Sequence, residues 1–404
     1  MYLTKEEERT LSGEDGETLQ KAIEILVALG DIYGADRLIP IKSAQIAGVS
    51  YKTIGDAGLE WISDLEGKVK VPSILNPAGM DLVRWNEMGI TPKFSQKQQK
   101  IIAAYEKLGV TPKCTCTPYY LDNFTLGYGD HVAWSESSAI SYANSVLGAR
   151  TNREGGPSAL SAALIGKTAN FGYHLEEKRK PSVSVTVECN LSGSDYAALG
   201  YLIGGDVGSR VPLFFLQNEP EGDELKALGA AMAASGAVAL YHVDGVTPDA
   251  RKMTFGKPDE NIIIEEKQIR GVYDRMPDEA KRGADVDMVA LGCPHCSADE
   301  LAHIARLLDK KRVGKDVWVC TSREVAEHYP QFVDKIERSG ALVVCDTCMV
   351  VSPASENYKL MMVNSGKALA YVPGMCKVPA RFGSIEDCIK EALKGSGDTD
   401  GNGN

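Results

Sequence analysis

The sequence lacks any long hydrophobic run and any excess of positive charge. No stretch of eighteen or more apolar residues occurs among its 404 residues, so the sequence indicates no membrane-spanning helix. The first residues, MYLTKEEERTLSG, are too charged for a secretory signal peptide. A formal net charge of −11 does not supply the basic face that nucleic acid requires. We therefore expect a cytoplasmic globular protein that binds neither membranes nor nucleic acid.

The sequence also lacks an internal repeat, and its length exceeds the usual size of a single hydrophobic core. We expect an N-terminal α/β region over residues 1–120 and a small-residue-rich α/β region with an arginine loop over 121–260. A regular α/β region over 261–393 and a tail over 394–404 complete the expected organisation. The tail, KGSGDTDGNGN, contains no apolar residue and is expected to be disordered.

From about residue 260 the sequence alternates between apolar strands and helices with recognisable start signals. Capping pairs, in which Ser or Thr precedes an acidic residue by three positions, occur in this region as Ser297 with Glu300, Thr321 with Glu324, and Ser384 with Asp387. A further pair, Thr4 with Glu7, lies near the N-terminus. The alternation predicts a parallel sheet covered by helices. Ligands of such sheets bind beyond the carboxyl ends of the strands.

Cysteines gather at those strand ends. Disulfides are disfavoured for the ten cysteines of a cytosolic chain, which leaves buried apolar thiols, metal ligands or redox thiols. The strand-end cysteines are Cys293, Cys320, Cys345, Cys348 and Cys376. Three thiolates around one point suit an iron–sulfur cluster or zinc. The two C-x-x-C pairs lie too far apart for a zinc ribbon, and the segment after CDTC is unlike a thioredoxin site, so a cluster is favoured while zinc stays an alternative.

A second concentration of polar residues lies in WSESSAISYANSVLGARTNREGGP. Its loop places Arg150, Asn152 and Arg153 before the glycine turn 155–156 and the start of another helix. Guanidinium forks bind carboxylate or phosphate through two hydrogen bonds, so the loop is a candidate anion site. The alternative is a solvated loop with ordinary surface ion pairs.

Seven segments together resemble the aconitase X family. They are GVSYKTIGDAGLEWI, LNPAGMD, CTPYY, WSESSAISYANSVLGARTNREGGP, ALGCPH, CDTCMVVSP and GMCKVPARFG, and the similarity extends almost to residue 390. The resemblance implies a hydro-lyase with an aconitase-like α/β fold. Several α/β lobes with parallel, helix-covered sheets would surround a central iron–sulfur cluster. The length of the chain resembles the large subunit of the two-chain forms of this family.

The resemblance also implies a set of site residues. Cys293, Cys348 and Cys376 would be the cluster ligands, with Cys296 and Cys345 as neighbours. A 4Fe-4S cluster is expected, with 2Fe-2S and 3Fe-4S as alternatives.

Catalytic and binding roles follow from the same resemblance. His295, Glu136 and Ser137 would be catalytic, with His295 assisting the departure of hydroxide or, alternatively, capping the next helix. Arg150, Asn152, Arg153 and Ser138 would bind the substrate. The base of aconitase-like enzymes is a serine on a further domain, so we expect a small subunit to supply it and this chain alone to be nearly inactive.

Two substrates are consistent with the family. The first is (R)-5-phosphomevalonate, dehydrated to trans-anhydromevalonate 5-phosphate in an archaeal mevalonate route to isoprenoids, and the second is cis-3-hydroxy-L-proline. A non-catalytic zinc or cluster scaffold is the alternative from another class of protein. Candidate phosphate contacts for the first substrate are Lys167, Arg179, Lys180, Lys377 and Arg381.

Overall fold

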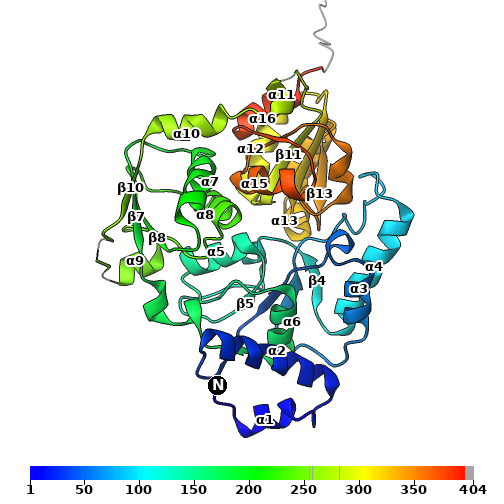
Figure 1. The fold of residues 1–404 in the computed structure, drawn as a ribbon. Coiled ribbons are helices and arrows are strands. Elements are labelled where there is room, and N and C mark those ends of the chain that lie inside the picture. Colours follow the sequence, from blue (N-terminus) through cyan, green and yellow to red (C-terminus); the bar gives the residue numbers. More distant parts are fainter. Residues whose placement is uncertain (254, 257, 282, 396–404) are drawn as a thin grey trace, which may run out of the picture.

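The computed structural model describes residues 1–253, 255–256, 258–281 and 283–395. Figure 1 shows three lobes, each built around a parallel sheet, coloured blue to cyan, green, and yellow to orange in chain order. Of the tail expected to be disordered, residues 394–404, all but the first two residues lie outside this description. None of the helices in the described ranges has the length and apolar character needed to cross a bilayer.

The first lobe contains a four-stranded sheet in the order β4-β3-β2-β5 and an antiparallel pair, β1 and β6. Its strands are β1 (Leu38–Pro40), β2 (Ala44–Ile46), β3 (Ser73–Leu75), β4 (Thr111–Cys114), β5 (Ala133–Trp134) and β6 (Lys167–Ala169). Its helices are α1 (Lys5–Leu11), α2 (Glu17–Tyr33), α3 (Tyr51–Ser63), α4 (Pro92–Lys107), α5 (Ser137–Ser145) and α6 (Gly156–Ile165), with the 3₁₀ turn η1 (Pro118–Tyr120).

The second lobe has a parallel sheet in the order β10-β7-β8-β9. Its strands are β7 (Val183–Val187), β8 (Pro212–Phe215), β9 (His242–Val243) and β10 (Asn261–Ile264). Its helices are α7 (Asp195–Val207), α8 (Gly222–Gly236), α9 (Pro248–Lys252) and α10 (Glu266–Tyr273), preceded by η2 (Gly172–His174) and η3 (Glu176–Arg179). The small residues of α7 and α8 allow these helices to pack closely: a Cβ on Gly204 or Gly200 would collide with α8.

The third lobe carries the regular parallel sheet expected from the sequence, in the order β13-β12-β11-β14-β15. Its strands are β11 (Met288–Cys296), β12 (Asp316–Thr321), β13 (Leu342–Cys345), β14 (Met361–Val363) and β15 (Ala380–Phe382). Its helices are α11 (Asp278–Lys281), α12 (Ala298–Leu308), α13 (Arg323–His328), α14 (Pro330–Arg338), α15 (Gly366–Met375) and α16 (Ile385–Ala392), with η4 (Pro353–Asn357).

Three of the four expected capping boxes are present. Thr4, Ser297 and Ser384 each cap a helix and form the reciprocal bond with the acidic residue three positions on. The prediction for Thr321 was wrong, because β12 extends through this residue and its hydroxyl donates to the Cys296 carbonyl at 2.8 Å. Ser322 caps α13 instead.

The sheets divide the chain at points other than the expected region boundaries at 120 and 260. Strand β5, after residue 120, pairs with β2 of the first lobe, and β10, after residue 260, pairs with β7 of the second. One hydrophobic core joins the second and third sheets, whereas the first sheet has a core of its own. The first lobe meets the second through α5, which packs against α8, and its residues Met80, Met88 and Ile90 join the core of the other two sheets.

Candidate functional site

The carboxyl ends of the first and third sheets face each other. The loop after β3 reaches the loop after β13, where the Ala78 N–H donates to the Asp346 carbonyl at 2.7 Å. The loop after β2 also reaches the segment after β13, where the Ser50 hydroxyl donates to the Val351 carbonyl at 3.0 Å. This is the location at which open α/β sheets bind ligands.

A cavity of about 420 Å³ lies between these two sets of loops. The first lobe contributes residues after all four strands of its sheet: Ala47, Gly48, Val49, Ser50 and Thr53, then Asn76 and Pro77, then Cys116, then Ser135, Glu136 and Ser137, with Arg153 beyond them. The third lobe contributes Cys293, Cys348, Val350, Val351, Lys367, Tyr371 and Met375. Thiols, an acid, two cations and hydroxyls thus surround one space.

Three cysteine thiols line this cavity: Cys116, Cys293 and Cys348. They come from three different strand ends, and the Cys116 sulfur accepts the backbone N–H of His295 at 3.2 Å, which ties the first of these ends to the second. Burial raises the pKa of all three thiols, that of Cys116 to about 12, while nearby Lys367 opposes the rise. The thiols are therefore protonated until a metal displaces their protons.

The sequence analysis identified two of these three cysteines. Cys116 was missed as a ligand because β4 is a short strand in a region without clear strand–helix alternation; its only signal was the resembling segment CTPYY. Cys376, the third expected ligand, is not among the cavity-lining residues, and its thiol donates to the Met349 carbonyl at 3.2 Å. Cys296, Cys320 and Cys345 are buried and also stand back from the cavity.

The arrangement of the thiols bears on the kind of metal they suit. Across the residues that the structure describes, no three histidine, cysteine, aspartate or glutamate side chains are placed to share one metal ion. A tetrahedral zinc requires its sulfurs within about 2.3 Å of one point, whereas the ligands of a multi-iron cluster stand farther apart around a larger body.

Glu136 and Lys367 form a buried ion pair at the cavity wall, contributed by α5 and α15. Burial would raise the pKa of Glu136, but the charge and hydrogen bond of Lys367, the Asn76 amide at 2.8 Å and the Ser138 N–H outweigh this effect and lower it. The same pairing raises the pKa of Lys367 against its own burial. This pair therefore places one negative and one positive charge at the cavity wall at neutral pH.

Arg153, Ser137 and Ser138 lie at or directly behind the cavity. Arg153 lines it, is solvent-exposed, and donates to the Ala237 carbonyl at 3.0 Å; within the described ranges no carboxylate pairs with its guanidinium. Ser137 also lines the cavity, with its hydroxyl 3.5 Å from that of Tyr371. Ser138 points to the ion pair, where its hydroxyl accepts from Lys367 at 3.1 Å.

Arg150 and Asn152 do not reach the cavity, so their expected contact with substrate is not supported. The Arg150 guanidinium pairs with buried Asp249 at 3.2 Å. The Asn152 amide donates to the Phe171 carbonyl at 2.9 Å and accepts the Tyr173 N–H at 2.9 Å. Arg150 therefore fastens the arginine loop to α9 of the second lobe, and Asn152 fastens it to the segment after β6. Arg153 lines the cavity and also contacts the second lobe, through the Ala237 carbonyl.

His295 is also placed differently from the expectation. Its ring is 0% exposed and lies between the Thr347 carbonyl, 2.9 Å from Nε2, and the Thr115 hydroxyl, 3.0 Å from Nδ1. Burial lowers its pKa to about 4, so the ring is neutral, and because a carbonyl only accepts, Nε2 carries the proton. Ser297 rather than His295 caps the next helix. His295 therefore joins the strand ends that carry the thiols.

The loop after β2 lines the cavity and contains backbone donors that the described chain does not use. Gly48, Val49 and Ser50 line it, and within the described chain their N–H groups have no hydrogen-bond acceptor. Val49 and Ser50 are buried, where an unpaired N–H is rare and costly. Gly156 lets this loop pack against the start of α6, since a Cβ there would lie 2.4 Å from the Ala47 carbonyl. We call residues 48–50 the anion loop, because an anion is the natural acceptor for such donors.

The candidate phosphate contacts lie elsewhere. Arg179 is fully buried against Asp249 and Asn144 in the second lobe, and Lys167 pairs with Glu7. Lys180 and Lys377 are exposed, and none of the five candidates lines the cavity.

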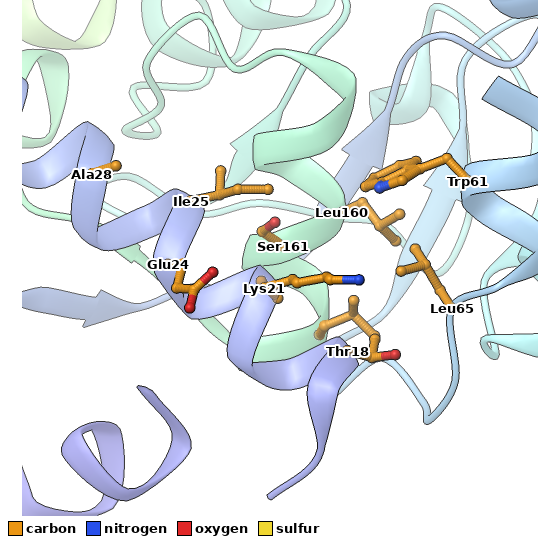
Figure 2. Close-up of a pocket in the computed structure, with 11 residues that line it drawn as sticks. Thr18, Lys21, Glu24, Ile25, Ala28, Trp61, Leu65, Leu160 and Ser161 are labelled. Carbon is orange, nitrogen blue, oxygen red and sulfur yellow. The ribbon is translucent and has the colours of Figure 1, made fainter. Parts of the chain in front are cut away.

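A second pocket, of about 350 Å³, lies between α2, α3 and α6 (Figure 2). Its walls are mainly apolar, with Trp61, Leu65 and Leu160 facing Ile25 and Ala28 of α2. No cysteine or histidine lines it, and its one lysine is paired with Glu17 at 2.6 Å. This pocket therefore lacks the thiols and the buried ion pair that the thiol-lined cavity has.

Three α/β lobes with parallel sheets, and a thiol-lined cavity between the first and the third, are the features expected of an aconitase-like protein. Family models for the first, second and third domains of aconitase X match residues 1–177, 181–274 and 286–394. The chain belongs to the aconitase X family.

Individual relatives cover nearly the whole chain. The chain is 66% identical to the phosphomevalonate dehydratase large subunit of Methanosarcina mazei, over 98% of each protein. The enzyme of that name from Methanocaldococcus jannaschii is 49% identical over 96% of this chain and 100% of its own length. The cis-3-hydroxy-L-proline dehydratase of Pseudomonas aeruginosa is 34% identical, and the match covers 95% of this chain but 69% of that protein.

A solved structure shares the fold. The holo-form of Thermococcus kodakaraensis aconitase X matches with a TM-score of 0.89 and 46% identity, over 97% of this chain and 100% of the other. The expected aconitase-like α/β fold is thereby confirmed.

Proposed function

We propose that this chain is the large subunit of a phosphomevalonate dehydratase, a hydro-lyase that removes water from (R)-5-phosphomevalonate in an archaeal mevalonate pathway. The observation that carries the proposal is identity of 47–66% along nearly the full length of several large subunits so named. The hydroxyproline dehydratases are less similar and are longer than this chain. All ten cysteines are free, which fits a reducing cytoplasm.

We propose Cys116, Cys293 and Cys348 as the ligands of an iron–sulfur cluster, with Cys116 in place of Cys376. The support is that these three thiols line one cavity and come from strand ends that converge there. Three thiolates on a four-iron cluster leave one iron without a protein ligand. Such an iron supplies Lewis acidity toward the hydroxyl group that leaves.

The remaining cavity residues bind and orient a substrate with two anionic ends. Arg153 and Lys367 supply fixed positive charge, and the anion loop supplies backbone donors. These groups favour a dianion and would stabilise the negative charge that develops beside the carboxylate when a proton leaves carbon. The side-chain amide oxygen of Asn76, Oδ1, is buried without a partner in the described chain and can accept a hydrogen bond from a hydroxyl of the substrate.

The base is expected from a small subunit. Glu136 is engaged by Lys367 and Asn76, and among the described residues the Ser137 hydroxyl has Glu136 and the Tyr371 hydroxyl as its hydrogen-bond partners, so both side chains are already occupied within this chain. The relatives are named large subunits, which implies a second chain. A serine supplied by that chain would remove the carbon-bound proton, a step that contributes about a hundred- to ten-thousand-fold in rate.

The test is an anaerobic assay of the chain co-purified with its small subunit. We expect dehydration of 5-phosphomevalonate, no conversion of cis-3-hydroxy-L-proline, and little turnover by the large chain alone. Conversion of hydroxyproline alone would show that hydroxyproline, and not 5-phosphomevalonate, is the substrate. Zinc without iron and no activity would support a scaffold instead.

Arg153→Lys is expected to reduce kcat/KM about ten- to a hundred-fold while cluster content stays the same. Lysine keeps the charge but loses the planar two-point fork, and a hydrogen bond to a charged group contributes about 1.5 to 3 kcal/mol. Arg150→Lys is not a fair control, because Arg150 is buried; Arg251→Lys, on the exposed face of α9, should leave turnover unchanged. Equal rates in the Arg153 variant and the wild type would place this arginine outside the substrate site.

A further inference from the structure

The anion loop is held in place by one side chain that does not itself line the cavity. Gln98 of α4 is 0% exposed and makes three hydrogen bonds to backbone around the loop. Its Nε2 donates to the Val49 carbonyl at 2.9 Å, and its Oε1 accepts the Tyr51 N–H at 3.0 Å and the Gly79 N–H at 3.0 Å. A buried amide therefore joins the loops after β2 and β3.

One of these bonds fixes the direction of the loop's Ser50 N–H group. The Val49 peptide carbonyl is turned toward Gln98, and the N–H of the same peptide unit, which belongs to Ser50, must point away from it. The N–H of Tyr51, directly after the loop, is also taken up by Gln98. The N–H groups of Gly48, Val49 and Ser50 are left without an acceptor beside the cavity.

The other side of the loop is fastened to the third lobe. The Ser50 hydroxyl reaches the Val351 carbonyl, two residues beyond Met349 in the segment that follows Cys348. Gly79 leaves room for this contact, because a Cβ there would lie 2.6 Å from the Ser50 hydroxyl. Gln98 thus acts on a loop that spans from the substrate side of the cavity to the thiol-bearing segment.

We infer that Gln98 is a positioning residue that aims the backbone N–H groups of residues 48–50 at an anionic group, phosphate or carboxylate, of the bound substrate. The inference rests on the proposed function, since it assigns one end of the substrate to this loop. Gln98 acts through the loop and does not touch the substrate. Its loss should weaken substrate binding more than it slows the chemical step.

Gln98→Glu is the sharpest variant, because the carboxylate has the same shape and still accepts from Tyr51 and Gly79 but cannot donate to the Val49 carbonyl. We expect the holo complex to show KM for 5-phosphomevalonate raised about tenfold or more, with kcat changed less. Gln98→Met, which removes all three bonds, should raise KM at least as far. Gln99→Glu is the matched control, since Gln99 is the exposed neighbour on the same helix.

Binding of small anions separates this inference from the proposed function. Calorimetry with inorganic phosphate and with acetate measures the loop directly, even if the complex turns out not to act on 5-phosphomevalonate. Weaker phosphate binding in both Gln98 variants, with acetate unaffected, assigns the phosphate end to the loop, and the reverse assigns the carboxylate end. The inference would be overturned if variants that retain their cluster showed the KM and the anion affinities of the wild type. It would also be overturned if both variants lost the fold, because Gln98 would then have a purely structural role.

Discussion

Cys116→Ser is expected to remove most of the iron and sulfide from the purified protein and to abolish dehydration. Serine preserves the size of the side chain but is a poor ligand for iron, and a cluster with three protein ligands has none to spare. Cys293→Ser and Cys348→Ser should behave in the same way, because all three thiols line the cavity. Iron and acid-labile sulfide per chain, with the visible absorption spectrum, provide the measurement.

Two other cysteines serve as controls for this prediction. Cys114, two residues before Cys116, is buried outside the cavity, and Cys376 is hydrogen-bonded to the Met349 carbonyl. Cys114→Ser and Cys376→Ser should therefore keep their cluster, as should Cys320→Ser. Loss of iron in Cys376→Ser with retention in Cys116→Ser would restore the ligand set expected from the sequence.

Lys367→Met is expected to abolish turnover and to lower the free energy of unfolding by about 3 to 5 kcal/mol, the usual cost of removing one partner of a buried ion pair. Glu136 would lose the charge that keeps its pKa low, so burial would raise that pKa and favour the neutral acid. The cavity wall would lose both charges of this ion pair at once, and Arg153 would be left as its charged residue. Chemical denaturation and steady-state kinetics measure the two effects.

Lys226→Met separates stability from function. Lys226 is also buried and pairs with Glu300 at 2.5 Å and Asp223 at 2.8 Å, but it lies away from the cavity. We expect a comparable loss of stability with kcat/KM retained. The double variant Glu136→Gln with Lys367→Met should recover stability without recovering activity. Wild-type activity in the single variant Lys367→Met would show that Lys367 is not part of the active site.

Much of the fold was accessible from the sequence, because its signals are local. The alternation after residue 260 predicted the parallel sheet of β11 to β15, and three capping boxes occur where predicted. The error at Thr321 was one of register: Ser322, also a good cap, follows it directly. In the first lobe, strands as short as β5, with two residues, are too brief for periodicity to detect.

The site was harder to predict, because its contacts join distant segments. Glu136 and Lys367 are 231 residues apart, and nothing in the sequence around Lys367 distinguishes it from a surface lysine. Cys116 and Cys293 meet only because the carboxyl ends of two sheets face each other. Arg150 and His295 have residue types suited to catalysis, but tertiary packing turned both toward structural partners. Residue type and strand-end position therefore located the region but not every side chain in it.

The central claim is that the thiol-lined cavity is both the cluster site and the substrate site. The most direct test is the ⁵⁷Fe Mössbauer spectrum of the anaerobic complex, recorded before and after addition of 5-phosphomevalonate. If substrate binds beside an iron without a protein ligand, the signal of that iron should change while the others stay as they were. A spectrum unchanged by saturating substrate, in a preparation that dehydrates it, would show that the cluster and the substrate occupy separate sites.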